Sequence, residues 1–399
     1  MEEIPEIIKK INTERLADRL WHLVNIPSPT GQERKAVMAY ADMLKQAGAK
    51  VELDQFIPDS PAVTGRLQGN RPGKCLQLAG HIDTIHNPHP QPQRNGNIIS
   101  GRGSADMKNG LAAILEVVTV LNDSGCDFPG SLLITAYGQH ETPLGNQQPL
   151  IRMLENGVKG DAAIVAESFS DSVVTTAKGQ AIWNIVLRRK GKVCHELCRT
   201  PEMNNLLAAV IKLLDTLGQK NNELSAAPRN YPNLGPESLF TGQVHYGDFY
   251  NRVPNECRLQ GTYRWHPNHS FEQVQKEFAE TLDKTKLADN VSIELSWILS
   301  GDSYEVNPKE TIIQSLLSSF KNVTGKQHQI GGTSVVTDAC RIAGIGNIPV
   351  AVLGFDNETA HADYEFVRID RMYRSCRILL YTVLDYLNRT QDTPDTEQK

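Results

Sequence analysis

The stretch CLQLAGHID at residues 75–83 is a short apolar run that passes through a glycine into an imidazole and a carboxylate. An apolar run of this length, bounded by a breaker, is typical of a buried strand. The chain that leaves this strand carries His81 and Asp83 at its carboxyl end. In an open α/β sheet, the loops at the carboxyl ends of the strands converge on one crevice. The stretch therefore predicts a buried strand that leads into a site.

The segments around this strand alternate between helical and extended patterns. Two amphipathic helices are expected between Asn12 and Gly48, separated by the breaker-rich IPSPTGQE, in which Thr30 and Glu33 have the spacing of a capping box. A helical pattern and then two strand patterns follow at residues 109–121, 132–137 and 162–166. Strands that alternate with helices predict an α/β fold with a mainly parallel sheet flanked by helices.

A different pattern occupies the middle of the chain. After Lys178 the strand-like and helical segments follow an α+β order, and the α/β alternation returns after about Ser300. The sequence therefore predicts a catalytic α/β domain formed by residues 1–178 and 300–399. A smaller α+β domain, residues 179–299, interrupts it.

Composition and charge exclude several classes of protein. The 399 residues include 22% charged residues and carry a formal net charge of -5 without a basic run, so no nucleic-acid partner is expected. No stretch approaches the roughly 18 consecutive apolar residues that span a bilayer, and the first ten residues lack the apolar region of a secretory signal. The seven scattered cysteines contain no CxxC pair, which favours reduced thiols and a cytoplasmic location without a membrane partner.

Acidic and imidazole side chains recur where the predicted strands end. In chain order they are His81, Asp83, Asp106, Glu141, Glu167 and His361. Carboxylate and imidazole donors without thiolates are the ligands that a pair of zinc ions would need. The HxD spacing suggests that His81 binds a metal while Asp83 fixes the tautomer of His81 through the other ring nitrogen.

The sequence resembles the family of co-catalytic zinc amidohydrolases that includes acetylornithine deacetylase, succinyl-diaminopimelate desuccinylase, aminoacylase and glutamate carboxypeptidase. The motifs that carry the resemblance, besides the acid after LLITAY, are GHIDTI at 80–85, GRGSADMKNG at 101–110, AIVAES at 163–168, GGTSVVTDA at 331–339 and AHADYEFV at 360–367. The resemblance implies two divalent metal ions, one held by His81 and Glu167 and the other by Glu141 and His361, with Asp106 bridging both. Zinc is the expected metal, although cobalt or manganese would satisfy the same ligands.

The resemblance also implies that the inserted domain is a lid and dimerisation domain, so that the protein would form a homodimer. His195 would assist at the scissile carbonyl, and Asn251 would contact the substrate. Arg264 would clamp a free carboxylate of a small-molecule substrate, because a guanidinium binds a carboxylate through two parallel hydrogen bonds. The pocket would be lined by Gly332, Thr333 and Ser334.

The sequence departs from the family pattern at the general base. Members of the family carry two adjacent acids after the LLITAY-type strand, of which the first is the base and the second a metal ligand. Here the stretch reads Gln139-His140-Glu141, so His140 occupies the position of the base. His140 could itself accept the proton, since acid–base catalysis is the commonest role of an imidazole. Alternatively the substitution abolishes hydrolysis and leaves a binding site, or Glu141 is the base and the second metal is held weakly.

The function predicted from the sequence is metal-dependent hydrolysis of the amide bond in an N-acyl amino acid. A dipeptidase or carboxypeptidase using the same ions is the alternative among enzymes. A non-enzymatic binding protein on the same scaffold is the alternative outside them.

Overall fold

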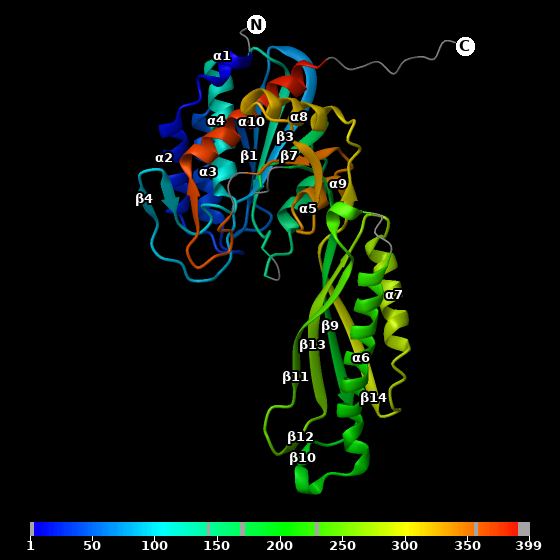
Figure 1. The fold of residues 1–399 in the computed structure, drawn as a ribbon. Coiled ribbons are helices and arrows are strands. Elements are labelled where there is room, and N and C mark those ends of the chain that lie inside the picture. Colours follow the sequence, from blue (N-terminus) through cyan, green and yellow to red (C-terminus); the bar gives the residue numbers. More distant parts are fainter. Residues whose placement is uncertain (1–3, 142–143, 168–171, 228–230, 355–357, 390–399) are drawn as a thin grey trace, which may run out of the picture. The chain divides into compact units, whose positions relative to one another are not determined.

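The computed structural model describes residues 4–141, 144–167, 172–227, 231–354 and 358–389, so Ser168 of the AIVAES motif lies outside the described residues. The chain divides into two compact units, which are described separately (Figure 1). The first unit comprises Met1–Thr175, Val306–Gly331 and Thr337–Lys399. The second comprises Thr176–Glu305 and Gly332–Val336.

The first unit is built on a mainly parallel sheet, which confirms the predicted fold class. Its strand order is β1-β2-β6-β3-β7-β17-β8. The four central strands, β6, β3, β7 and β17, are parallel, whereas β1, β2 and β8 pair antiparallel. The bounds are β1 Lys50–Asp54, β2 Ala62–Gln68, β3 Arg71–His81, β6 Pro129–Tyr137, β7 Ala162–Val165, β8 Ser172–Ala177 and β17 Val350–Val352. The stretch at residues 75–83 contains the buried C-terminal half of β3, as its apolar pattern predicted.

Helices flank this sheet. Their bounds are α1 Ile4–Ile8, α2 Thr13–Val24, α3 Arg34–Gln46, α4 Lys108–Asp123, α5 Gln148–Glu155, α8 Thr311–Thr324, α9 Ala339–Gly344 and α10 Ile369–Asn388. Helix α4 is buried from Lys108 to Leu121 and packs against both β3 and α10, because its sequence is apolar on almost every side. In the part of the chain that the structure describes, no helix is long and apolar enough to cross a membrane.

A small three-stranded sheet brings the C-terminal motif to the glycine-rich loop. It consists of β4 Gln93–Asn95, β5 Ile98–Ser100 and β18 Phe366–Arg368. Phe366 pairs with Ser100, so the residue before Phe366 lies beside the loop that follows Ser100. This pairing places AHADYEFV next to GRGSADMKNG, although the two motifs are far apart in the sequence.

One local prediction was wrong. Thr30 and Glu33 form no capping box, because Glu33 is itself the N-cap of α3 and its side chain makes no cap hydrogen bond. The Thr30 hydroxyl instead donates to Asp83 Oδ2 at 3.0 Å, and Glu33 Oε1 accepts from the backbone N–H of Gln139 at 3.0 Å. Both side chains are buried. Hydrogen bonds to distant residues at the site have replaced the local cap.

The second unit is an α+β structure with an antiparallel sheet of order β11-β13-β9-β14. The bounds are β9 Gly179–Arg189, β11 Ser238–Tyr246, β13 Glu256–Trp265, β14 Val291–Gly301, α6 Asn205–Ala226 and α7 Phe271–Asp283. Residues of β9 alternate between buried and half-buried, and the buried set, which includes Trp183, packs with Trp265 and Phe278. Shorter elements are β10 Cys194–His195, β12 Arg252–Val253, β15 Tyr304–Glu305 and the 3-10 turns Glu196–Cys198, Pro201–Asn204 and Pro232–Leu234.

The boundaries of the units differ from the predicted domains in three segments, residues 176–178, 300–305 and 332–336, which were all predicted in the catalytic domain and all lie in the second unit. In the third of these segments the Thr333 carbonyl accepts from the Lys178 N–H at 3.1 Å, and the Ser334 carbonyl accepts from Arg264 at 2.5 Å. The last strand before this segment, β16 Gln329–Thr333, runs into it. These long-range contacts leave no pattern in the local sequence, so the prediction could not have found them.

Candidate metal centre

The five predicted ligands and His140, which was predicted as the base, form two groups of metal-donor side chains. One group contains His81, His140 and Glu167, and the other contains Asp106, Glu141 and His361. Within each group the donor atoms lie within 4.8 Å of one another. His81 ends β3, His140 and Glu141 follow β6, and Glu167 follows β7. The carboxyl ends of adjacent parallel strands therefore bring these donors together, as expected for an open α/β sheet.

Asp106 links the two groups. Its Oδ1 lies 3.2 Å from His81 Nε2, and its Oδ2 lies 3.2 Å from His361 Nε2. His361 Nε2 is also 3.1 Å from Glu141 Oε1. Zinc ligands at about 2.0–2.2 Å from a tetrahedral ion are separated from each other by roughly 3.3–3.6 Å. One carboxylate with one oxygen in each group is the arrangement that two ions sharing a bridging ligand require.

The first group also fits a cation by its charge and its hydrogen bonding. Burial raises the pKa of Glu167 to about 8, although the neighbouring imidazoles of His140 and His81 oppose this shift. Glu167 Oε2 is buried and has no hydrogen-bond partner among the described residues. A buried carboxylate oxygen without a partner is costly unless an ion or a proton satisfies it. The donor set therefore fits divalent metal ions.

Asp83 holds the loop that carries two of the donors. Its carboxylate is fully buried and accepts the backbone N–H groups of His140 at 3.1 Å and of Glu141 at 3.0 Å. The nearest acceptor to His81 Nδ1 is the backbone carbonyl of Asp83, at 3.2 Å, whereas the Asp83 carboxylate is 3.5 Å away. Both oxygens lie on the side of the ring away from Asp106, so Nε2 of His81 faces the metal centre.

His140 lies against His81 and against an acid that the sequence analysis did not single out. The two imidazole rings are stacked, with centroids 4.0 Å apart and planes 6° from parallel. His140 Nδ1 is 2.7 Å from Asp338 Oδ1, and His140 Nε2 is 3.9 Å from Glu167 Oε1. Burial opposes the charged form of His140, but the carboxylates, of which Asp338 is the strongest influence, raise its pKa to about 10. Divalent cations beside the ring would lower the pKa of His140.

Glu365 is a second acid that the sequence analysis missed. It is fully buried and accepts backbone N–H groups of the glycine-rich loop from Gly103 at 3.0 Å, Ala105 at 2.9 Å and Asp106 at 3.0 Å. Arg102 pairs with the same carboxylate at 3.0 Å. Glu365 therefore fixes the backbone that presents Asp106. Asp338 and Glu365 both lie in motifs that had been recognised, and an acid within such a motif was the only available signal.

The substrate-contact residues predicted for the lid lie in the second unit, in two places. Asn251 and His195 are neighbours, with Asn251 Nδ2 3.1 Å from His195 Nε2. Arg264 is hydrogen-bonded to the Ser334 carbonyl, and burial lowers its pKa. Thr333 and Gly332 adjoin Ser334 in the same unit. The structure thus brings Arg264 together with the predicted lining segment and keeps His195 with Asn251.

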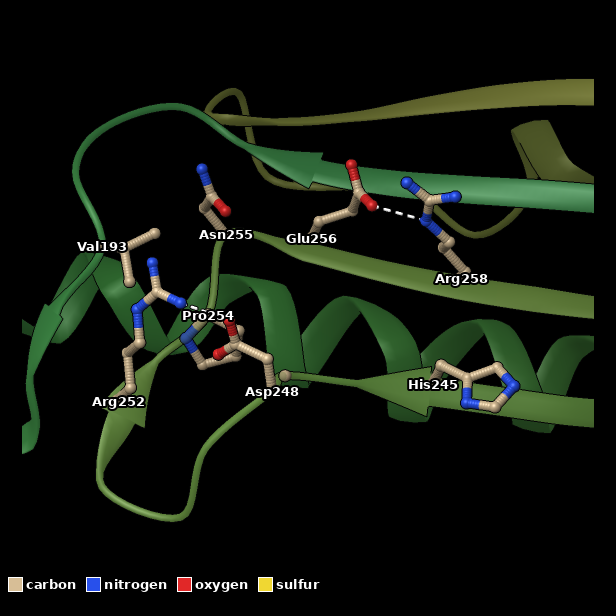
Figure 2. Close-up of a pocket in the computed structure, with 9 residues that line it drawn as sticks. Val193, His245, Asp248, Arg252, Pro254, Asn255, Glu256 and Arg258 are labelled. Carbon is tan, nitrogen blue, oxygen red and sulfur yellow. Dashed lines mark hydrogen bonds and ion pairs between the residues drawn. The ribbon is translucent and has the colours of Figure 1, made fainter.

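A pocket of about 330 Å³ lies in the second unit, and none of the predicted site residues lines it (Figure 2). Arg252 is paired with Asp248, and Arg258 donates to Glu256 at 2.6 Å. Since these charges neutralise one another, the lining offers no uncompensated group that would select a charged ligand.

Comparison with known proteins places this arrangement in a class. The family model described as Peptidase family M20/M25/M40 matches residues 77–385. An N-formyl-4-amino-5-aminomethyl-2-methylpyrimidine deformylase of Bacillus subtilis is 23% identical, with 92% of each chain covered. A succinyl-diaminopimelate desuccinylase of Rickettsia bellii is 25% identical over 94% of this chain and 97% of its own. A dipeptidase of Saccharomyces cerevisiae has a similar structure, with a TM-score of 0.76 at 14% identity, covering 98% of this chain and 99% of its own. A dinuclear metal-binding peptidase of Bacillus subtilis gives a TM-score of 0.69 at 14% identity, covering 95% and 99%.

The chain therefore belongs to the M20/M25/M40 peptidase family, which confirms the resemblance seen in the sequence. It is a metal-dependent hydrolase of amide bonds, either an amidohydrolase or an exopeptidase.

Proposed function

We propose that this protein removes the acyl group from an N-acyl amino acid and that His140 is its general base. The observation that carries the proposal is the pair of donor groups joined by Asp106, with His140 Nε2 directed toward Glu167 beside them. The curated relatives support deacylation, because two of them are named for removing a formyl or a succinyl group.

The stacking of His140 on His81 supports a base rather than a metal ligand. The lone pair of an imidazole nitrogen lies in the plane of its ring, so a bound metal also lies close to that plane. Parallel rings whose centroids are 4.0 Å apart cannot both contain the same ion in their planes. His81 is the ring whose Nε2 approaches Asp106. We therefore assign His81 as the ligand and leave His140 free to exchange a proton.

The position of Glu141 supports its role as a ligand and not as the base. Glu141 Oε1 lies 3.1 Å from His361 Nε2, within the second donor group, and its backbone N–H is fixed by Asp83. His140 precedes it and points toward the first group. Adjacent residues after β6 thus serve different groups.

Each residue then has a defined part in the reaction. Two divalent ions, which we propose to be zinc, would be held by His81, Glu167, Asp106, Glu141 and His361 and would acidify water and polarise the amide carbonyl. His140 Nε2 takes a proton from the attacking water and later gives it to the leaving nitrogen. Asp83 holds the backbone of His140 during both transfers.

The proposed substrate is a small molecule with a free carboxylate, which Arg264 binds in place of the Ser334 carbonyl. Asn251 contacts the substrate, and His195, its neighbour, assists at the scissile carbonyl. We propose neither a nucleic-acid nor a membrane partner. The seven free cysteines support a cytoplasmic location.

We also propose that the protein is a homodimer formed by the second unit. Strand β11 is an edge of its sheet and exposes Phe240, Val244 and Tyr246, while α6 exposes Leu207 and Ile211. An open sheet edge with exposed apolar side chains is a template for pairing with a second copy. Sedimentation should give twice the chain mass, and Val244→Lys on this edge should give the monomer.

The test of the enzymatic proposal compares the wild type with His140→Glu, which restores the residue that the family usually carries. Both proteins are loaded with zinc or cobalt and assayed on N-formyl, N-acetyl and N-succinyl amino acids and on dipeptides. We expect the wild type to hydrolyse at least one N-acyl amino acid. His140→Ala should lower kcat by about 10²–10⁴-fold, the usual contribution of a general base.

The other outcomes separate the alternatives. Turnover only by His140→Glu would contradict the proposal and identify a binding protein that has lost its base. Faster hydrolysis of dipeptides than of every acyl amino acid would identify an exopeptidase. An unchanged kcat in His140→Ala would mean that another group is the general base.

A further inference from the structure

We propose that Asp338 is the positioning residue for His140, so that the two side chains form a carboxylate–imidazole pair. This inference deepens the proposed function and rests on it. Asp338 would act only through the ring of His140, by fixing which nitrogen carries the proton.

The contact between the two residues is short and shielded from water. Asp338 Oδ1 lies 2.7 Å from His140 Nδ1, and Asp338 is fully buried. Hydrogen bonds between a carboxylate and an imidazole N–H are roughly twice as strong as those between neutral groups. Since an ionised carboxylate only accepts hydrogen bonds, Nδ1 must be the nitrogen that carries the hydrogen. In the neutral ring the lone pair is then on Nε2, on the side of the ring that faces Glu167.

The Asp338 side chain is neither a helix cap nor a metal donor, and besides His140 it has as a polar neighbour the Tyr137 hydroxyl, whose pKa burial and Asp338 both raise. It is the N-cap residue of α9, but its side chain makes no cap hydrogen bond. Its carboxylate belongs to neither group of metal donors, and Oδ2 is buried without a hydrogen-bond partner among the described residues. A buried, partly unsatisfied carboxylate destabilises a fold. The side chain is therefore placed for His140 at the expense of stability.

The substitution at the base position explains why such a partner is needed. A glutamate base presents two equivalent oxygens and needs no tautomer, whereas a neutral imidazole accepts a proton at only one nitrogen. An imidazole with its hydrogen on Nε2 would have no lone pair facing the reacting water. Asp338 selects the competent tautomer, as the buried acid does in serine-hydrolase triads.

The first test measures the effect of Asp338→Asn in two backgrounds with two metal ions bound. In the wild type we expect kcat to fall by about 10²–10⁴-fold with KM nearly unchanged, because the asparagine amide can donate to Nδ1 and move the hydrogen to Nε2. In the His140→Glu background the same substitution should change kcat less than threefold, or raise it. Glu116→Gln is the matched control, since it also neutralises a fully buried acid in the first unit but lies on α4, away from the donors.

Equal losses of kcat in both backgrounds, or a loss no larger than that in Glu116→Gln, would overturn the proposal. Loss of bound metal in Asp338→Asn would also overturn the proposal, because it would indicate that His140 is a metal ligand. A second measurement does not depend on turnover or on the variant folding. The ¹⁵N spectrum of histidine-labelled, zinc-loaded wild type should show His140 protonated at Nδ1 and free at Nε2. The opposite tautomer would refute the role of Asp338 even if hydrolysis is observed, whereas the expected tautomer without hydrolysis would refute only the proposed function.

Discussion

Replacing Glu365 by glutamine should loosen the loop that presents Asp106. The Glu365 carboxylate accepts three backbone N–H groups at 2.9–3.0 Å and pairs with Arg102 at 3.0 Å. Hydrogen bonds to a charged group contribute about 1.5–3 kcal/mol each, and breaking a buried ion pair costs about 3–5 kcal/mol. The glutamine amide keeps one oxygen that can accept, but its NH₂ group would face backbone N–H groups, which are donors as well. We therefore expect Glu365→Gln to lower the free energy of unfolding by about 3–5 kcal/mol.

The same substitution should weaken metal binding, because Asp106 follows directly from the loop that Glu365 holds. Loss of a residue that orients a ligand typically reduces metal affinity by about 10–100-fold. Urea unfolding of the metal-free protein measures the free energy of unfolding, and competition with a chelator measures the metal affinity. Glu358→Gln is the control, since Glu358 pairs with Arg368 and Arg371 at the surface, where the loss of an ion pair changes stability little. Equal stability losses in the two variants, with unchanged metal affinity, would refute the role given to Glu365.

Three further changes test other parts of the structure. Glu141→Ala removes a donor from one group only, so metal analysis should find one ion lost and one retained; loss of both would contradict two separable groups. Glu116→Gln leaves Arg15 and Arg19 without their shared buried carboxylate, so the free energy of unfolding from urea titration should fall by about 3–5 kcal/mol with metal content unchanged. Gly110→Ala would place a Cβ 1.9 Å from the Ala166 carbonyl oxygen, next to the donor Glu167. Metal titration should then show weaker binding of one ion, and an unchanged isotherm would contradict this.

Much of the fold could be predicted from the sequence because its signals are local. The apolar run that ends at Ala79, the helical pattern of residues 109–121 and the short apolar runs before Glu141 and Glu167 each record burial in neighbouring residues. The short strands β4, β5 and β18 were missed, since three residues carry too little periodicity to be recognised.

The α/β alternation, the order of the donor residues and the imidazole of His140 before Glu141 can all be recognised in the sequence. The folded structure is needed to show what surrounds that imidazole, namely the stacked ring of His81 and the buried carboxylate of Asp338. The folded structure also shows that the Glu33 side chain holds the loop before His140 and makes no cap hydrogen bond. Burial and periodicity produce patterns in neighbouring residues, so they can be recognised from a sequence. A hydrogen bond between residues 198 positions apart, such as that of His140 and Asp338, exists only after the strands have aligned.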